Sequence, residues 1–172
     1  MSAVLIVGAG QAGASAAIAL RQGGYAGAIT IAGAEPDLPY ERPPLSKEYL
    51  AGEKPPERLL LRPPAFWAER SISILAGTRI TAINGHTATA DSGETFAFDH
   101  LIWAAGGEAR RLAIPGGEHA HVIRTRHDTD RLRAALGAQT RIAIIGGGYI
   151  GLEAAAVLTK LGHRVTLLEA QD

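Results

Sequence analysis

The stretch that decides the fold is AVLIVGAGQAG, residues 3–13. Its five leading apolar residues are typical of a buried strand, and they run directly into three glycines at the spacing Gly-x-Gly-x-x-Gly: Gly8, Gly10 and Gly13. In this arrangement the first glycine permits a tight turn, the second lets the backbone approach a pyrophosphate, and the third lets the helix pack close to the strand. The N–H groups that begin that helix favour an anion. The stretch therefore predicts a dinucleotide-binding β-α-β unit.

The same design returns in RIAIIGGGYIG, residues 141–151. Its glycines keep the register of the first stretch: Gly146, Gly148 and Gly151. A helix that ends at a glycine follows each stretch, and the chain then enters a β-rich run, residues 28–32 in the first case and 164–168 in the second. The repeat completes two β-α-β units and predicts two dinucleotide sites in one chain.

One acidic residue stands near the end of the second strand in each unit. Glu35 follows the first β-rich run, and Glu169 closes the second. A carboxylate at this place accepts hydrogen bonds from ribose hydroxyls and repels a 2′-phosphate. Glu169 therefore favours NADH over NADPH at the second site.

The segment between the two units begins with a proline-rich stretch. Most of the prolines lie in residues 36–64, which predicts an extended loop with one short helix that Ser46 caps and Gly52 ends. Residues 71–99 alternate in short runs, the first of them residues 72–74, and predict an antiparallel meander.

Two further elements are expected before the second unit. Residues 101–104 are apolar and predict a buried strand that returns to the main sheet. Residues 124–136 are mostly helical, and Asp128 or Thr129 is the expected cap.

These patterns predict an α/β fold with two Rossmann-like units of the glutathione-reductase type and an antiparallel β-meander, with the chain ending within the second unit. Two dinucleotide sites in one chain indicate a flavin enzyme in which one site holds FAD and the other admits the nicotinamide. The expected domains are the first part of an FAD-binding domain, residues 1–112, and the start of an NAD-binding domain, residues 113–172.

Composition narrows the function further. The 172 residues carry 17 basic and 17 acidic side chains, so no overall field favours nucleic acid or an anionic membrane as a partner. Cysteine is absent from the sequence, which excludes disulfides, thiolate metal sites and CxxC redox pairs, and is compatible with a cytoplasmic location. The six histidines show no metal-ligand spacing, so no metal site is predicted.

Two motifs carry a resemblance to a known family. Residues 39–47 read PYERPPLSK, and residues 146–153 read GGGYIGLE. In this order they resemble motifs of the FAD-dependent ferredoxin and rubredoxin reductases of oxygenase systems, and the resemblance covers essentially the whole chain. It implies an oxidoreductase that passes electrons from NADH through FAD to a [2Fe–2S] ferredoxin, which in turn serves an oxygenase.

The resemblance also implies the site residues. The expected FAD contacts are Gly8, Gly10, Ala12, Gly13, Glu35, Arg42, Lys47, Ile80, Ala104, Gly106 and Arg124. The expected NADH-binding residues are Gly146, Gly148, Tyr149, Ile150, Gly151, Glu153 and Glu169. Lys47, near the flavin N5, and its partner Glu153 would have the catalytic role of tuning hydride transfer, and Tyr149 would be a movable gate over the flavin.

The electron acceptor is the last expectation. Disulfide reductases of this fold place a reactive cysteine in the region that corresponds to residues 38–50, and this sequence has none there. A one-electron carrier such as a ferredoxin fits better. Two alternatives stay open: a flavoprotein resembling apoptosis-inducing factor, which acts mainly through NADH-controlled partner binding, and a non-catalytic nucleotide-binding fragment. Family members continue past the point that corresponds to Asp172, so the remainder of the chain or a complementary fragment is an expected partner.

Overall fold

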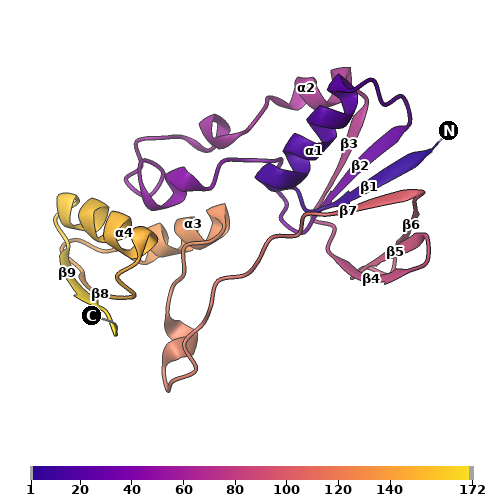
Figure 1. The fold of residues 1–172 in the computed structure, drawn as a ribbon. Helices are drawn as coiled ribbons and strands as arrows, with labels where there is room; N and C mark the ends of the chain where they lie inside the picture. Colours follow the sequence, from indigo (N-terminus) through magenta and orange to yellow (C-terminus); the bar gives the residue numbers. More distant parts are fainter. Residues whose placement is uncertain (1, 171–172) are drawn as a thin grey trace. The chain divides into compact units, whose positions relative to one another are not determined.

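Figure 1 shows the protein as a computed structural model, in which residues 2–170 are described. The chain divides into two compact units, which we call lobes. The first lobe comprises Met1–Glu41 and Leu60–Gly107, and the second comprises Arg42–Leu59 and Glu108–Asp172. Residues 42–59 thus belong to the second lobe, although the sequence on both sides of them belongs to the first. The domain boundary predicted after residue 112 stays a prediction.

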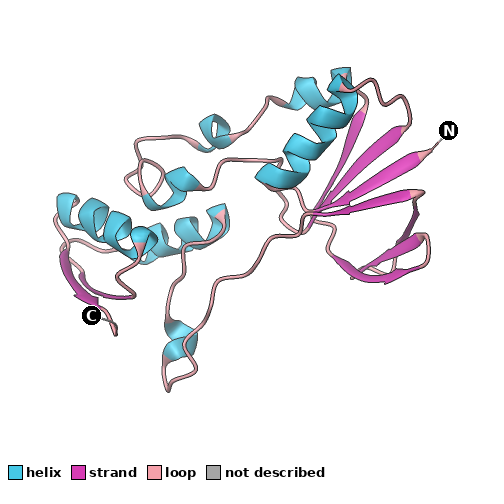
Figure 2. Ribbon diagram, viewed as in Figure 1, coloured by secondary structure: helices cyan, strands magenta, loops and turns pink. Residues whose placement is uncertain are grey.

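A parallel sheet forms the centre of the first lobe. Its strands are β1 (Ala3–Val7), β2 (Ala28–Gly33), β3 (Ile72–Ala76) and β7 (His100–Trp103), in the order β3-β2-β1-β7. Figure 2 shows α1 (Gln11–Gln22) and α2 (Pro64–Glu69) on one side of this sheet. The first predicted β-α-β unit and the predicted return of the chain to the main sheet are confirmed.

Successive side chains of β1 point to opposite faces of the sheet. Because all of them are apolar, both faces are apolar. On the helix side the core consists of Val4, Ile6, Ala14, Ala17, Ile29, Ile31, Trp67 and Ile72. On the other side it consists of Leu5, Val7, Ala32, Ile80, Ala88, Ala90 and Phe98. Burial on both faces explains why β1 is a continuous apolar run rather than an alternating one.

The second of these faces is covered by an antiparallel meander. Its strands are β4 (Ile80–Asn84), β5 (Thr87–Ala90) and β6 (Thr95–Ala97). The prediction that residues 72–74 belong to the meander was wrong, because they lie in β3 and pair in parallel with β2. A short alternating run has the same pattern in either sheet, and contacts distant in sequence decide which sheet it joins.

The Arg21 side chain ties the end of α1 to the start of β3. Its guanidinium donates hydrogen bonds to four backbone carbonyl oxygens, those of Tyr25, Gly27, Arg70 and Ser71, at 2.6–2.8 Å. Ser71 itself has a φ of +50°, an uncommon value for a residue with a side chain. One charged group therefore satisfies the carbonyls of two turns in the first lobe.

The second lobe contains the second β-α-β unit. Strands β8 (Arg141–Ile145) and β9 (Arg164–Leu168) pair in parallel, and α4 (Tyr149–Lys160) connects them. The remaining elements are α3 (Arg126–Ala135) and three short 3-10 helices, η1 (Pro43–Ser46), η2 (Pro56–Leu59) and η3 (Gly117–His119). The second predicted unit is therefore confirmed, and so is the helix expected within residues 124–136.

Residues 42–59 are bound to this lobe by both apolar and polar contacts. Leu50 is buried against Ala154 and Leu158 of α4. The buried hydroxyl of Thr129, in α3, donates a hydrogen bond to the carbonyl oxygen of Leu45, in η1. The proline-rich stretch is thus held by the two helices of the second lobe.

Two predicted caps were wrong. Ser46 is the last residue of η1 rather than the cap of a helix, and turns follow it as far as Gly52. The cap of α3 is Thr125, which exchanges hydrogen bonds with Asp128 in a capping box. The sequence offered several polar residues near this start, and the pattern alone could not rank them.

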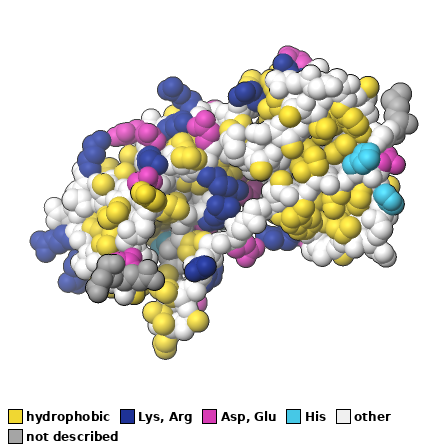
Figure 3. Space-filling model, in the orientation of Figure 1, with side chains coloured by type: hydrophobic (Ala, Val, Ile, Leu, Met, Phe, Trp, Pro, Cys, Tyr) yellow, Lys and Arg dark blue, Asp and Glu magenta, His cyan; other side chains and the backbone are white. Residues whose placement is uncertain are grey.

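Within the described part of the chain, no helix combines the length and the apolar character that a membrane crossing requires. Figure 3 shows basic and acidic side chains close to one another on the visible face of the second lobe, whereas the visible face of the first lobe is largely hydrophobic.

Candidate functional site

The glycine turn of the first lobe is closed by backbone contacts. Gly8 has a φ of +113°, and a Cβ atom there would lie 2.1 Å from the carbonyl oxygen of Ala104. A Cβ atom on Gly13 would lie 1.9 Å from the carbonyl oxygen of Gly8. Because these distances are far below van der Waals contact, both positions require glycine. The turn therefore brings three predicted site residues together: Gly8, Gly13 and Ala104.

The middle glycine of this turn has a different environment. Among the described residues, no atom lies within 4 Å of the place that a Cβ atom on Gly10 would take. Gly10 precedes α1 with extended backbone, and no side chain of the described residues caps the first N–H groups of the helix. Open space beside uncapped N–H groups fits the pyrophosphate of a dinucleotide. Packing of the first lobe gives no other reason for a glycine at this position.

The second lobe repeats this geometry. Gly146 has a φ of +108°, and a Cβ atom on Gly151 would lie 2.0 Å from the carbonyl oxygen of Gly146. Nothing in the described residues lies within 4 Å of a Cβ atom placed on Gly148. The second turn thus offers the same space for a pyrophosphate, at the start of α4.

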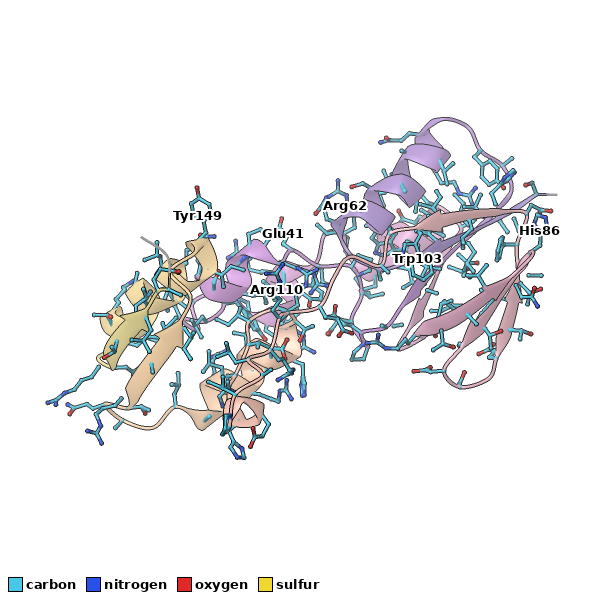
Figure 4. The ribbon with its side chains drawn as sticks, turned by 60° about the horizontal axis from the view of Figure 1, so that its bottom comes forward. Glu41, Arg62, His86, Trp103, Arg110 and Tyr149 are labelled. Atoms are coloured by element: carbon cyan, nitrogen blue, oxygen red, sulfur yellow. The ribbon has the colours of Figure 1, made fainter. Side chains whose placement is uncertain are left out.

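Two predicted cofactor-binding side chains begin α4 and are exposed. Tyr149 is 89% exposed and Ile150 is 55% exposed. Figure 4 shows Tyr149 projecting away from the helix. Neither side chain is needed in the core of the second lobe, so both are free to contact a ligand.

The acid of the first lobe lies just beyond β2. The hydroxyl of Tyr40 donates a hydrogen bond of 2.5 Å to Oε2 of Glu35. The main chain of Glu35 is also fixed, because its carbonyl oxygen accepts the N–H of Gly77 at 2.8 Å. Glu35 is therefore held at the end of the sheet, where a ribose is expected.

The acid of the second lobe stands at a different position along its strand from the acid of the first lobe. Val7 pairs with Ala32 and Ile145 pairs with Leu168, so Glu169 corresponds to Gly33 and Glu35 stands two residues later. The carboxylate of Glu169 accepts the backbone N–H of Gly147, inside the glycine turn. The two units therefore carry their acids two positions apart in the strand register. The sequence pattern had given Glu35 and Glu169 equivalent places.

Small residues account for this difference. A Cβ atom on Gly33 would lie 2.5 Å from the Cβ atom of Ala9, so the first lobe has no room for a side chain on that rung. In the second lobe Gly147 takes the place of Ala9, and a Cβ atom there would lie 3.0 Å from Oε2 of Glu169. The exchange of an alanine for a glycine makes room for the carboxylate.

Lys47 and Glu153 form an ion pair in the second lobe. Nζ of Lys47 lies 2.9 Å from Oε1 of Glu153, and the side chains are 42% and 31% exposed. The other carboxylate oxygen, Oε2, accepts the hydroxyl of Ser46 at 2.6 Å. The Ser46 hydroxyl and the Lys47 ammonium together hold the pKa of the Glu153 carboxyl below its usual value. The structure therefore places the two predicted catalytic residues in contact.

The remaining predicted residues are divided between the lobes. Nη1 of Arg42 donates to the carbonyl oxygen of Arg124 at 2.6 Å within the second lobe. In the first lobe Ile80 begins β4 and is buried, Gly106 follows β7 with a φ of +69°, and Ala12 is exposed in the first turn of α1. The contacts of these residues with a cofactor stay predictions.

Sequence reasoning missed two residues of these clusters. Ser46 was considered as a helix cap and as part of a motif, and Tyr40 only as part of that motif. Each donates its hydroxyl to a carboxylate that had been singled out, Glu153 and Glu35 respectively. Tyr40 follows Glu35 by only five positions, a signal that could have been used, whereas Ser46 and Glu153 are 107 positions apart.

Comparison with known proteins gives the family. Residues 2–172 match the profile described as pyridine nucleotide-disulphide oxidoreductase. A ferredoxin–NAD(P)+ reductase of Sphingomonas sp. is 54% identical over 98% of this chain and 42% of its own length. The ferredoxin–NAD+ reductase component of a p-cumate 2,3-dioxygenase system from Pseudomonas putida is 44% identical over 100% of this chain and 44% of its own.

A solved structure agrees with these relatives. The crystal structure of a covalent putidaredoxin reductase–putidaredoxin complex matches with a TM-score of 0.90 at 40% identity, over 96% of this chain and 42% of that one. The chain therefore belongs to the pyridine nucleotide-disulphide oxidoreductase family, and the predicted fold class and the predicted resemblance to ferredoxin reductases are confirmed. It spans less than half the length of the relatives that it matches.

Proposed function

We propose that the complete protein carrying this chain passes electrons from NADH through FAD to a [2Fe–2S] ferredoxin, and that this ferredoxin serves an oxygenase. The observation that carries the proposal is the pair of glycine turns, each of which leaves its middle glycine, Gly10 or Gly148, open to a pyrophosphate. Two relatives support the ferredoxin and the oxygenase in this proposal, because one is named a ferredoxin–NAD(P)+ reductase and the other a reductase component of a dioxygenase system.

The first turn would hold FAD. Gly8, Gly10 and Gly13 bring the backbone to the pyrophosphate, and Glu35, oriented by Tyr40, would accept hydrogen bonds from the ribose hydroxyls. FAD supplies the conversion of a two-electron hydride into single electrons. The other residues expected to contribute contacts to it are Ala12, Arg42, Lys47, Ile80, Ala104, Gly106 and Arg124.

The second turn would hold NADH. Gly146, Gly148 and Gly151 repeat the pyrophosphate cradle, and the Glu169 carboxylate beside Gly147 would bind the ribose diol. A 2′-phosphate would bring negative charge against that carboxylate, so NADH is favoured over NADPH. The exposed Tyr149 side chain would be the movable gate over the flavin, and the exposed Ile150 side chain would contribute a cofactor contact.

Lys47 and Glu153 would tune the transfer. An ammonium group near the flavin stabilises the negative charge that develops on the ring as it accepts hydride. Glu153 holds the ammonium in place through the 2.9 Å contact and moderates its field. Since residues 38–50, the region in which disulfide reductases of this fold carry their reactive cysteine, contain no cysteine, a one-electron carrier protein is the proposed acceptor. We place the protein in the cytoplasm.

An anaerobic visible spectrum of the complete protein, recorded before and after addition of NADH and then of a [2Fe–2S] ferredoxin, tests the function. We expect flavin bands that bleach with NADH and recover as the ferredoxin is reduced. Absence of flavin bands would favour a nucleotide-binding module without catalysis. A stable reduced complex that ignores ferredoxin would favour a flavoprotein that acts through partner binding.

A further inference from the structure

Ser46 and Lys47 are neighbours in sequence, and together they hold both oxygens of one carboxylate. The Ser46 hydroxyl donates to Oε2 of Glu153 at 2.6 Å, while the Lys47 ammonium contacts Oε1 at 2.9 Å. A carboxylate held by one ion pair can rotate about its last bond, whereas one held at both oxygens has a fixed plane. The contact with Ser46 therefore restricts the carboxylate that Lys47 uses.

The two groups differ in exposure, and this separates their tasks. Ser46 is 4% exposed, whereas the side chains of Lys47 and Glu153 are 42% and 31% exposed. An exposed ion pair alone is weak and mobile. A buried hydroxyl at a fixed place in η1 is a better anchor, because solvent does not compete for its hydrogen bond.

The backbone that carries Ser46 is itself fixed from two sides. The Thr129 hydroxyl binds the carbonyl oxygen of Leu45 at 3.3 Å, and Leu45 is 2% exposed. The Lys47 ammonium also lies 3.4 Å from the carbonyl oxygen of Pro43, so the lysine folds back over η1. The 3-10 turn thus presents the hydroxyl and the ammonium to α4 as one rigid unit.

From this geometry we infer that Ser46 is a positioning residue, which fixes the Glu153 carboxylate and so sets how much of the Lys47 charge is neutralised. The inference rests on the proposed role of Lys47 beside the flavin. A hydroxyl that donates to the carboxylate draws negative charge away from the ammonium. Without the hydroxyl the carboxylate neutralises Lys47 more fully, and the reduced flavin loses stabilisation.

The first test does not involve the flavin. The δ-carbon of Glu153 is followed by ¹³C NMR through a pH titration of the complete protein, in the wild type and in Ser46→Ala. We expect the Ala variant to raise the pKa of the Glu153 carboxyl toward its usual value, because one of the two groups that stabilise the ionised form is lost. An unchanged pKa would overturn the inference.

Thr129→Val is the matched control. It also removes a hydroxyl that binds η1, but through the carbonyl oxygen of Leu45 and not through the carboxylate. We expect it to lower the free energy of unfolding without moving the pKa of Glu153. An equal shift of the pKa in both variants would mean that η1 is loosened in general, and would also overturn the inference.

The second test is a spectroscopic redox titration of the flavin with dithionite and mediator dyes, without NADH or ferredoxin. We expect Ser46→Ala to make reduction about three- to tenfold less favourable, which for a two-electron couple lowers the midpoint potential by roughly 15 to 30 mV. Ser46→Thr keeps a hydroxyl and should keep the wild-type potential.

A double-mutant cycle decides whether Ser46 acts through Glu153. In a Glu153→Ala background, Ser46→Ala should leave the potential unchanged, because no carboxylate remains to be positioned. A shift of the same size in both backgrounds would refute the inference. If the wild-type flavin accepts electrons from NADH but none reach a ferredoxin, the proposed function fails while these two tests still decide the role of Ser46.

Discussion

Gly10 and Gly13 stand three positions apart in one turn but meet opposite surroundings. We expect Gly13→Ala to lower the free energy of unfolding by about 3 kcal/mol or more, because its Cβ atom would overlap the carbonyl oxygen of Gly8. Gly10→Ala should change it by less than about 1 kcal/mol, since its Cβ atom meets open space. Urea denaturation of the protein without cofactor measures both, and similar losses would contradict the assignment of space to Gly10.

Arg21 is the residue on which the connection between α1 and β3 depends. Lysine at this position keeps the charge but offers one compact ammonium in place of a planar fork, so it cannot reach all four carbonyl oxygens. We expect Arg21→Lys to cost about 2 kcal/mol of unfolding free energy. Arg62→Ala is the control. The Arg62 guanidinium donates a hydrogen bond to the carbonyl oxygen of its neighbour Leu61 and lies 5.4 Å from the centre of the Phe66 ring, so it does not join separate turns. A loss as large in the control would contradict the role of Arg21.

At the scale of single residues, the sequence predicted which residues form the sites better than it predicted which residues they contact. The glycines of both turns and the pairing of Lys47 with Glu153 were predicted, the former from spacing and the latter from the resemblance. The anchor Ser46 was not, because its partner is 107 positions away and a serine before a lysine has many local uses. The different rungs of Glu35 and Glu169 also required the strand register, which spacing alone does not contain.

The capping box at the start of α3 makes that helix sensitive to acid. Burial raises the pKa of Asp128, but hydrogen bonds from Thr125 and the contact with Arg131 outweigh this and leave the pKa below its ordinary value of 3.8. A carboxyl whose pKa is lowered in the folded state stabilises the fold when the pH is above the ordinary pKa of that carboxyl. This contribution is lost as the pH falls through the folded-state pKa.

We therefore expect Asp128→Asn to flatten the decline of stability in acid. The wild-type unfolding free energy should fall as the pH decreases below 3.8, and the Asn variant should start lower at neutral pH and fall less. Urea denaturation between neutral pH and the acid limit of the fold measures the two curves. Asp91→Asn, on an exposed turn of the first lobe, is the control, and parallel curves for the wild type and Asp128→Asn would contradict the expectation.

The elements themselves were mostly predictable. Apolar runs that end in glycine identified both β-α-β units, because a strand, a tight turn and a helix each leave a local pattern. The strand β3 was assigned to the wrong sheet since its neighbour is β2, more than forty positions away. Residues 46–52 were expected to be helical, but η1 ends at Ser46 and turns follow it. The burial of Leu45 and Leu50 and the hydrogen bonds of Ser46 and Lys47 hold the backbone in these turns.

At the scale of the whole molecule, the two open glycines predict one pyrophosphate site in each lobe. We expect Gly148→Ala to weaken NADH binding about tenfold or more while the protein keeps its full flavin content, because the added methyl occupies the space of one pyrophosphate only. Gly10→Ala should instead lower the flavin content of the purified protein. Flavin absorbance per protein and NADH titration measure the two effects, and loss of flavin in both variants would contradict the division.

The order in which the chain is synthesised adds a consequence of the second lobe's composition. Residues 42–59 leave the ribosome long before the helix that completes their environment, since Ser46 and Glu153 are 107 positions apart. At ordinary rates of translation that interval is roughly 5 to 20 s. For most of it Leu45 and Leu50 have neither α3 nor α4 to cover them, and α4 is the last to be made. The segment that carries Lys47 is thus made well before the helices that bury its leucines, and a nascent chain arrested in this window would expose an apolar, proline-rich segment to chaperones and proteases.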